Sequence, residues 1–255
     1  MALWKVKNIT KTPKLKNPIL IEGLPGIANV GKVAVDFIVD KLGTTRLFSF
    51  SSHRFPHSVF VNEKNLVELP SIELHYKKHN SQDLLFLVGD IQPIDEESCY
   101  EFCEMILDLF KELGGKELIT LGGIGLGDIP KKPKVYCTAT SRDVIKKYGT
   151  GMDNNLYGVV GPIMGVTGLL IGLAPKKKIS GIAMLAETYG HPMYIGVKGA
   201  REILKILKAR FKLKLKLEEL DKEIETVEKD IIKRSEELSN VVKKSGKKQD
   251  MSYIG

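Results

Sequence analysis

Two short apolar runs, each followed by a glycine, constrain the fold more than any other feature of this sequence. Leu84–Gly89 reads LLFLVG, and residues 18–22 read PILIE before Gly23. A continuous apolar run of this length is typical of a strand covered on both faces, because a solvated face would show alternating polar residues. Strands of this kind are usually parallel and connected by helices. We therefore expect an α/β sheet.

Helical segments alternate with these runs. Apolar spacing predicts one helix from Val30 that ends at Gly43, and a second that Asp95 opens and Gly114 ends. Further strands are predicted at residues 46–50, 58–61, 71–76, 117–121, 135–139, 159–160, 179–185 and 193–197. Such alternation predicts a three-layer α/β/α sandwich, which we assign to residues 1–200.

The sequence changes character near its C-terminal end, since no Gly or Pro occurs from Ala200 to Ser245. Apolar residues there recur in steps of three and four, which is a heptad pattern. The pattern predicts a helical arm at 201–245, followed by a tail at 246–255. Residues 211–217 also show period two, so the arm can break there into two helices. Two interpretations stay open: an amphipathic helix on its own domain, or a coiled-coil-like surface for a second copy. The oligomerisation residues of the second interpretation are Leu217, Leu220, Ile224, Val227 and Ile231.

Gly26–Lys32 (GIANVGK) matches the first seven positions of a P-loop, GxxxxGK, between a predicted strand and a predicted helix. The next residue is Val33, whereas a P-loop carries Ser or Thr there to hold Mg²⁺. A chain rich in Gly and Lys also yields this pattern by chance. We favour a tight strand-to-helix turn, and keep a nucleotide-dependent enzyme using Gly26–Lys32 as the alternative.

Other patterns of catalysis or cofactor binding are weak. The histidines at 53, 57, 75, 79 and 191 lack metal-binding spacing, and Gly123–Gly127 lacks the GxGxxG spacing of a dinucleotide site. No nucleophile and base stand in a known arrangement. We therefore expect no enzyme, no catalytic residue, no metal and no cofactor.

Composition indicates which kinds of partner and which cellular compartment to expect. The net charge is +8, but it comes from 33 Lys against 6 Arg, which favours a solvated surface over nucleic-acid binding. Leu156–Ala174 is uncharged, yet Pro162 divides it, so a strand, a turn and a core helix are expected and not a membrane span. Three cysteines form no disulfide framework, and residues 1–18 do not resemble a signal peptide. A cytoplasmic protein is expected.

Two segments carry a family resemblance. Gly23–Ala34 (GLPGIANVGKVA) resembles the "GLPGxxNVGxxA" signature of the proteasome assembly chaperone family, in its archaeal, ATP-independent branch, and residues 154–170 and 181–187 resemble a second signature. The resemblance implies an α/β/α sandwich with a helical extension. It also implies homo-oligomers that bind proteasome α subunits and assist assembly without ATP, with a second family member as a further candidate partner.

The resemblance further implies docking through a C-terminal tail with a hydrophobic residue, a Tyr and any last residue. This chain ends Ser252-Tyr253-Ile254-Gly255, so Tyr253 stands one position early and Ser252 replaces the hydrophobic residue. We predict Tyr253, Ile254 and Gly255 as the partner-binding residues. A Tyr without a docking role at the chain end is the alternative.

Overall fold

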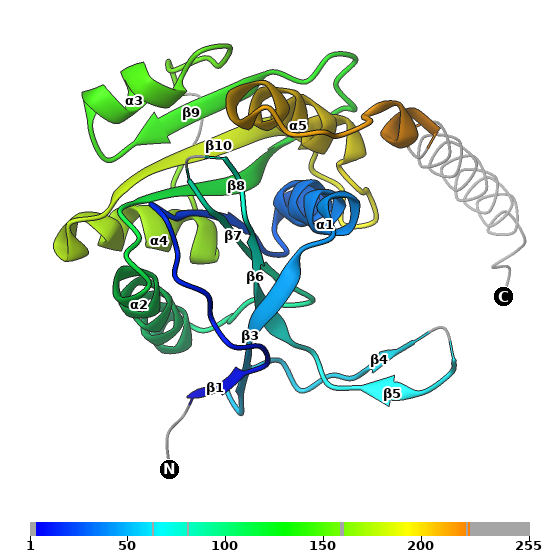
Figure 1. Cartoon of the computed structure of the whole chain (residues 1–255). Helices are drawn as coiled ribbons and strands as arrows, with labels where there is room; N and C mark the ends of the chain where they lie inside the picture. The colour runs from blue at the N-terminus through cyan, green and yellow to red at the C-terminus, as the bar shows by residue number, and fades with distance from the viewer. Residues whose placement is uncertain (1–3, 63, 81, 159–160, 223, 225–255) are drawn as a thin grey trace, which may run out of the picture. The chain divides into compact units, whose positions relative to one another are not determined.

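The computed structural model describes residues 4–62, 64–80, 82–158, 161–222 and 224. Its main sheet has eight described strands, and the four central ones, β7, β2, β8 and β10, run parallel (Figure 1). The strand order is β1 (Trp4–Asn8), β3 (Thr45–Ser52), β6 (Ile72–Lys77), β7 (Leu84–Gly89), β2 (Ile19–Gly23), β8 (Glu117–Leu126), β10 (Ser180–Tyr189) and β9 (Val135–Ala139).

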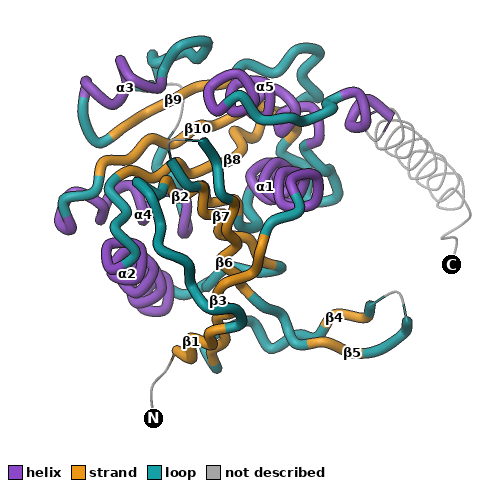
Figure 2. The backbone as a smooth tube through the Cα atoms, viewed as in Figure 1, coloured by secondary structure: helices purple, strands orange, loops and turns teal. Residues whose placement is uncertain are grey.

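Helices cover both faces of this sheet, as the tube view shows (Figure 2). On one face α1 (Val30–Leu42) packs against α5 (Val197–Phe211), and on the other α2 (Glu96–Glu112) packs against α4 (Gly165–Leu173). The shorter α3 (Arg142–Tyr148) lies near β9. The expected three-layer α/β/α fold is confirmed.

The two central apolar runs lie where the sequence predicts. All six residues of β7 and all five of β2 are buried, because helices cover them on both sides. The ends of the helices also follow the sequence. The Asp95 side chain accepts a hydrogen bond from Ser98 N (2.9 Å) at the start of α2, and Gly43 ends α1 in the left-handed conformation.

One predicted strand does not form, and strands β8 and β10 continue beyond their predicted ends, β10 to Tyr189. No strand forms at 193–197, because Val197 begins α5 and its apolar residues follow helical spacing. Strand β8 does not stop at Gly122 but continues to Leu126, since Gly123 lets the strand pass close to its neighbours. A Cβ on Gly123 would lie 2.6 Å from Ile27 O. The strand predicted at 159–160 lies outside the described residues.

The strand predicted at 58–61 is only two residues long in the structure and is not part of the main sheet. Strand β4 (Phe60–Val61) pairs with β5 (Val67–Glu68) in a separate two-stranded hairpin that extends from the main sheet (Figure 1). Neither β5 nor the edge strand β1 was predicted. Strand β5 is only two residues long, and the alternation of apolar and polar residues in β1 (WKVKN) extends over only five residues.

The C-terminal region belongs to a unit of its own. The chain divides after Leu215 into two units, and the second begins at Lys216. Helix α5 crosses the boundary expected at residue 200 and buries an apolar stripe on its own domain, so the first interpretation of the heptad pattern holds for 197–211. The helix ends at Phe211, inside the segment where a break was allowed.

Only 216–222 and 224 of the second unit are described, and there Leu220 N donates to Leu217 O (3.1 Å). Ile224 is helical. Val227, Ile231, Tyr253, Ile254 and Gly255 lie outside the described residues, so the coiled-coil-like association remains a prediction. Within the described ranges no helix is long and apolar enough to cross a membrane.

Candidate functional site at the carboxyl ends of the parallel strands

A cleft of about 420 Å³ lies at the carboxyl ends of β2 and β8. One wall is the turn with Gly26 and Ile27, another is the end of β8, and residues 161–165 before α4 close it. The two segments with family resemblance therefore meet at one place. In open α/β sheets, ligands bind at this edge. The lining is mainly Gly and aliphatic, so it offers shape and apolar contact and little charge.

The turn after β2 is tight, as predicted. Asn29 N donates to Gly26 O (3.0 Å), and Ala28 and Asn29 both have positive φ, at 49° and 55°. A Cβ on Gly23 would lie 2.3 Å from Gly31 O, and a Cβ on Gly31 would lie 2.3 Å from Leu121 O. These glycines let α1 approach the backbone of β2 and β8 closely, which is a packing role.

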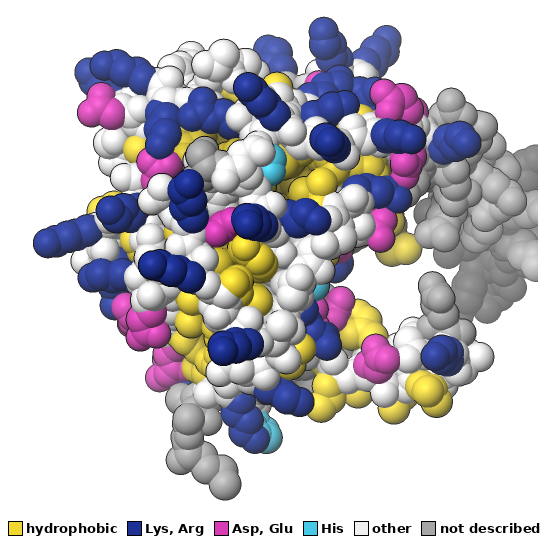
Figure 3. Space-filling model, viewed as in Figure 1, with side chains coloured by type: hydrophobic (Ala, Val, Ile, Leu, Met, Phe, Trp, Pro, Cys, Tyr) yellow, Lys and Arg dark blue, Asp and Glu magenta, His cyan; other side chains and the backbone are white. Residues whose placement is uncertain are grey.

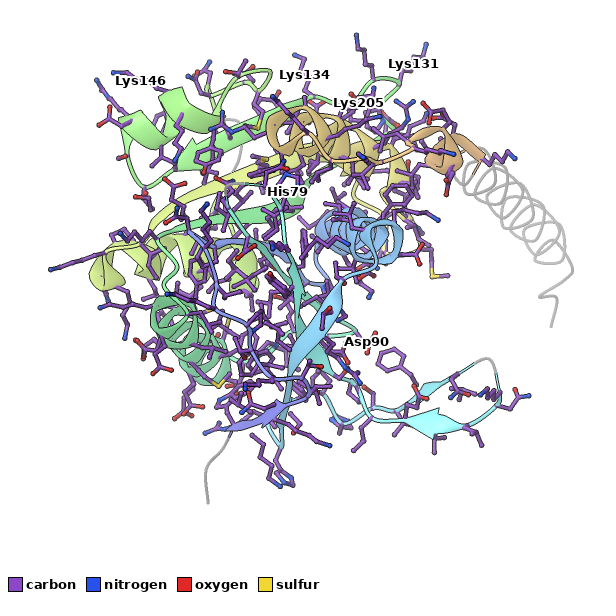
Figure 4. All side chains as sticks on the ribbon, in the orientation of Figure 1. His79, Asp90, Lys131, Lys134, Lys146 and Lys205 are labelled. Atoms are coloured by element: carbon purple, nitrogen blue, oxygen red, sulfur yellow. The ribbon has the colours of Figure 1, made fainter. Side chains whose placement is uncertain are left out.

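Lys32, in the first turn of α1, has a structural role next to this turn. Its Nζ lies 2.8 Å from Asp36 Oδ2, donates to Gly89 O (3.0 Å) and lies 3.8 Å from Asp90 Oδ1; Figure 4 labels Asp90. Partial burial raises the pKa of Asp36, which the neighbouring Lys32 opposes. A P-loop lysine points at phosphates instead. Two carboxylates beside the ammonium disfavour a triphosphate here.

Glu22 lies buried under the cleft and was not predicted. Its Oε1 accepts from Leu24 N (2.9 Å), and Thr167 Oγ1 donates to its Oε2 (3.3 Å), so the carboxyl links β2 to α4. Desolvation raises the pKa of Glu22 to about 8, which leaves it protonated at neutral pH. The available signal was a single charged residue inside an apolar buried run.

Several of the other polar candidates have structural partners. His75 contacts Glu73 (2.8 Å) and Thr44 (3.0 Å), and His79 contacts Phe211 O (2.6 Å). Cys99 and Cys103 are buried thiols on α2. No three His, Cys, Asp or Glu side chains in the described part of the chain are grouped so as to hold a metal.

Exposed apolar side chains border the cleft. Ile27 and Met164 line it and are also exposed. Ile94, Tyr157 and Met193 are exposed in nearby connections, each of which leaves or enters the carboxyl edge of the sheet. Monomers seldom present several large apolar side chains together unless they bind something there. The edge thus suits contact with an apolar protein surface.

Comparison with known proteins identifies the family of this chain. The model of the PAC2 family matches residues 20–234. The chain belongs to the PAC2 family. Two family relatives from Methanocaldococcus jannaschii are uncharacterized: MJ1210 is 30% identical, covering 99% of this chain and 100% of its own, and MJ0106 is 27% identical, covering 94% of each.

Solved structures extend the match. PbaB of Pyrococcus furiosus, described as an archaeal proteasome activator, is 28% identical, with a TM-score of 0.84 over 92% of this PAC2 chain and 100% of its own. PbaA of the same organism, described as an archaeal homolog of proteasome-assembly chaperone, is 22% identical, with a TM-score of 0.74 over 98% and 99%. At that identity PbaA supports the fold alone. The predicted family and fold class are confirmed.

Proposed function

We propose that this PAC2 protein is an ATP-independent assembly chaperone or adaptor that binds proteasome α subunits and acts as a homo-oligomer. The observation that carries the proposal is the similarity to PbaB over nearly the whole chain, at 28% identity and a TM-score of 0.84. A second family member is a further candidate partner. The three buried thiols suit a reducing cytoplasm.

The geometry of Gly23–Ala34, the segment with the first family signature, supports binding over catalysis. Gly23 and Gly31 are used for close backbone packing, and Lys32 is held by carboxylates. What the segment presents outward is Ile27 beside a Gly-lined cleft. Such a surface binds through shape and apolar area, which fits a chaperone that recognises an unassembled subunit.

Docking of the tail belongs to the same proposal. Tyr253 would supply apolar area and one hydroxyl to a pocket on the partner. Ile254 adds apolar area next to the ring. A short tail of this kind binds as an extended anchor, so its loss should remove affinity without changing the folded domain.

The test is capture of purified recombinant archaeal proteasome α subunits by the full-length protein. We expect capture by the intact chain, and loss after deletion of Tyr253–Gly255 or after Tyr253→Ala. Ser252→Ala is the matched control and should leave capture unchanged. Failure of the intact chain to capture α subunits would refute the proposal, and unchanged capture by the deletion would remove the tail from it.

ATP titration tests the alternative in the same preparation. The intact protein with Mg²⁺ should show no binding tighter than about 100 μM, equivalent to roughly −5.5 kcal/mol. Tighter binding that Lys32→Ala removes would restore the nucleotide-dependent enzyme.

A further inference from the structure

The β4–β5 hairpin exposes an aliphatic surface. Val61 pairs with Val67, and Phe60 pairs with Glu68. Because side chains alternate along a strand, continuing this register places Val59, Val61, Val67 and Leu69 on one side, here called the aliphatic face. Their exposed fractions are 55%, 66%, 70% and 80%. Four large apolar side chains exposed side by side are unusual for a surface that faces only water.

The hairpin is nevertheless held in a defined shape. Asn62 organises its turn: Asn62 N donates to Leu66 O (2.9 Å), and Asn62 Oδ1 accepts from Lys64 N and Leu66 N, each at 3.0 Å. The Asn62 amide also donates to Glu68 Oε1 (2.6 Å). An isolated two-stranded hairpin is marginal in water. A preformed hairpin binds with less loss of conformational entropy than a loop that must order.

Charge points to a second copy as the occupant. Residues 127–153 and 197–215 together hold thirteen Lys and Arg and four Asp and Glu, so they carry a net charge of +9, and the rest of the chain is close to neutral at −1. Lys131, Lys134, Lys146 and Lys205 from these segments lie away from the hairpin (Figure 4), and the hairpin itself presents apolar side chains, drawn yellow in Figure 3. Residues 53–72 hold two cations and two anions. Copies of a basic protein repel each other least where their surfaces are neutral.

A hollow at the base of the hairpin continues the aliphatic face. It has a volume of about 680 Å³, shares Val59 and Leu69 with that face, and is also lined by Phe55 and Pro56. At on the order of 100 Å² for each side chain, the four aliphatic residues offer roughly 400 Å² per copy. A stable interface buries about 800 Å² per partner, so the hollow must take part.

We propose that the aliphatic face packs on the same face of a second copy, around a twofold axis that sets the tip of each hairpin into the hollow of the other. The arrangement is self-complementary, since each copy supplies both a tip and a hollow. This inference deepens the oligomer part of the proposed function by naming its surface. It requires neither the helical arm nor the tail.

The test compares full-length variants by sedimentation velocity over a concentration series. We expect the unmodified protein to be oligomeric, and Val61→Lys with Val67→Lys to raise the dissociation constant at least about 100-fold, because two ammonium groups would have to be desolvated. Phe60→Lys with Leu66→Lys is the matched control. It adds the same two charges to the same hairpin at positions that are 44% and 59% exposed on the opposite face, and should leave association unchanged.

Two further measurements accompany the sedimentation experiment. Circular dichroism should show all variants folded, since each substituted side chain is exposed. Association should persist at high salt, because apolar contacts are not screened. An unmodified protein that is monomeric, an oligomer that survives the Val61/Val67 change, or one that dissociates only with Ile224→Lys would each overturn the assignment. Capture of α subunits is scored separately, so loss of capture by the intact chain refutes the proposed function while leaving the hairpin result standing.

Discussion

Glu22 makes the stability of this protein depend on pH in a direction opposite to that of most carboxylates. Its ordinary pKa of 4.5 is raised to about 8 by desolvation in the folded state. Folding therefore favours the protonated form. The stabilising contribution of that form is fully present below pH 4.5 and is lost as the pH rises to 8. Each unit of pKa shift corresponds to about 1.4 kcal/mol, so the loss is at most about 5 kcal/mol.

Glu22→Gln should remove this dependence while keeping the shape of the side chain. The amide oxygen can still accept from Leu24 N, and the amide nitrogen can donate to Thr167 Oγ1. Near pH 4.5 we expect the variant and the unmodified protein to have similar free energies of unfolding. At pH 9 the variant should be more stable by about 2–5 kcal/mol, because it has no charge to bury.

Urea unfolding at pH 4.5, 7 and 9 measures the effect. Glu112→Gln, at an exposed position on α2, is the control and should show no difference that grows with pH. A difference between the Glu22 variant and the unmodified protein that is the same at all three pH values would refute the reasoning, because it would mean that Glu22 does not titrate between 4.5 and 8.

Two further substitutions test the roles assigned to Gly31 and Lys32 at the start of α1, each by thermal and urea unfolding. Gly31→Ala places a Cβ 2.3 Å from Leu121 O and should destabilise the fold by about 2–4 kcal/mol, whereas Gly172→Ala has open space and should stabilise α4 by up to about 1 kcal/mol. Equal effects of the two would contradict the packing role of Gly31. Lys32→Met should cost about 1 kcal/mol at pH 7, since Asp36 and Gly89 O lose a partner, and no cost would mean that the ion pair has no structural value.

The sequence predicted the elements whose signal is local. Leu84–Gly89 was assigned to a buried strand because its six residues carry the pattern by themselves, and α1 because its periodicity is long and ends in a glycine. Residues 193–197 were misassigned because five residues are too few to separate strand from helix start. The aliphatic face was missed, since exposure of Val67 depends on what lies around it and not on its neighbours in sequence.

In the candidate site too, sequence patterns do not reveal features that depend on tertiary contacts. Ile27 and Met164 line one cleft although they are far apart in sequence, and spacing cannot reveal a contact of this kind. The raised pKa of Glu22 is also tertiary, because desolvation comes from α4 and β8 closing over β2. The family resemblance located the segments correctly, but only the structure brings them together.

The turn after β2 shows how a P-loop-like sequence can serve packing instead of phosphate binding. A phosphate-binding loop needs free backbone N–H groups and a cation directed at the ligand. Here Asn29 N is used within the turn, Gly31 is pressed against Leu121 O, and Lys32 faces carboxylates. The same Gly and Lys spacing thus stabilises the junction of α1 with the sheet. What remains exposed is the outward side, where Ile27 and the Gly-lined cleft offer apolar area, and this is the surface that the proposed function uses.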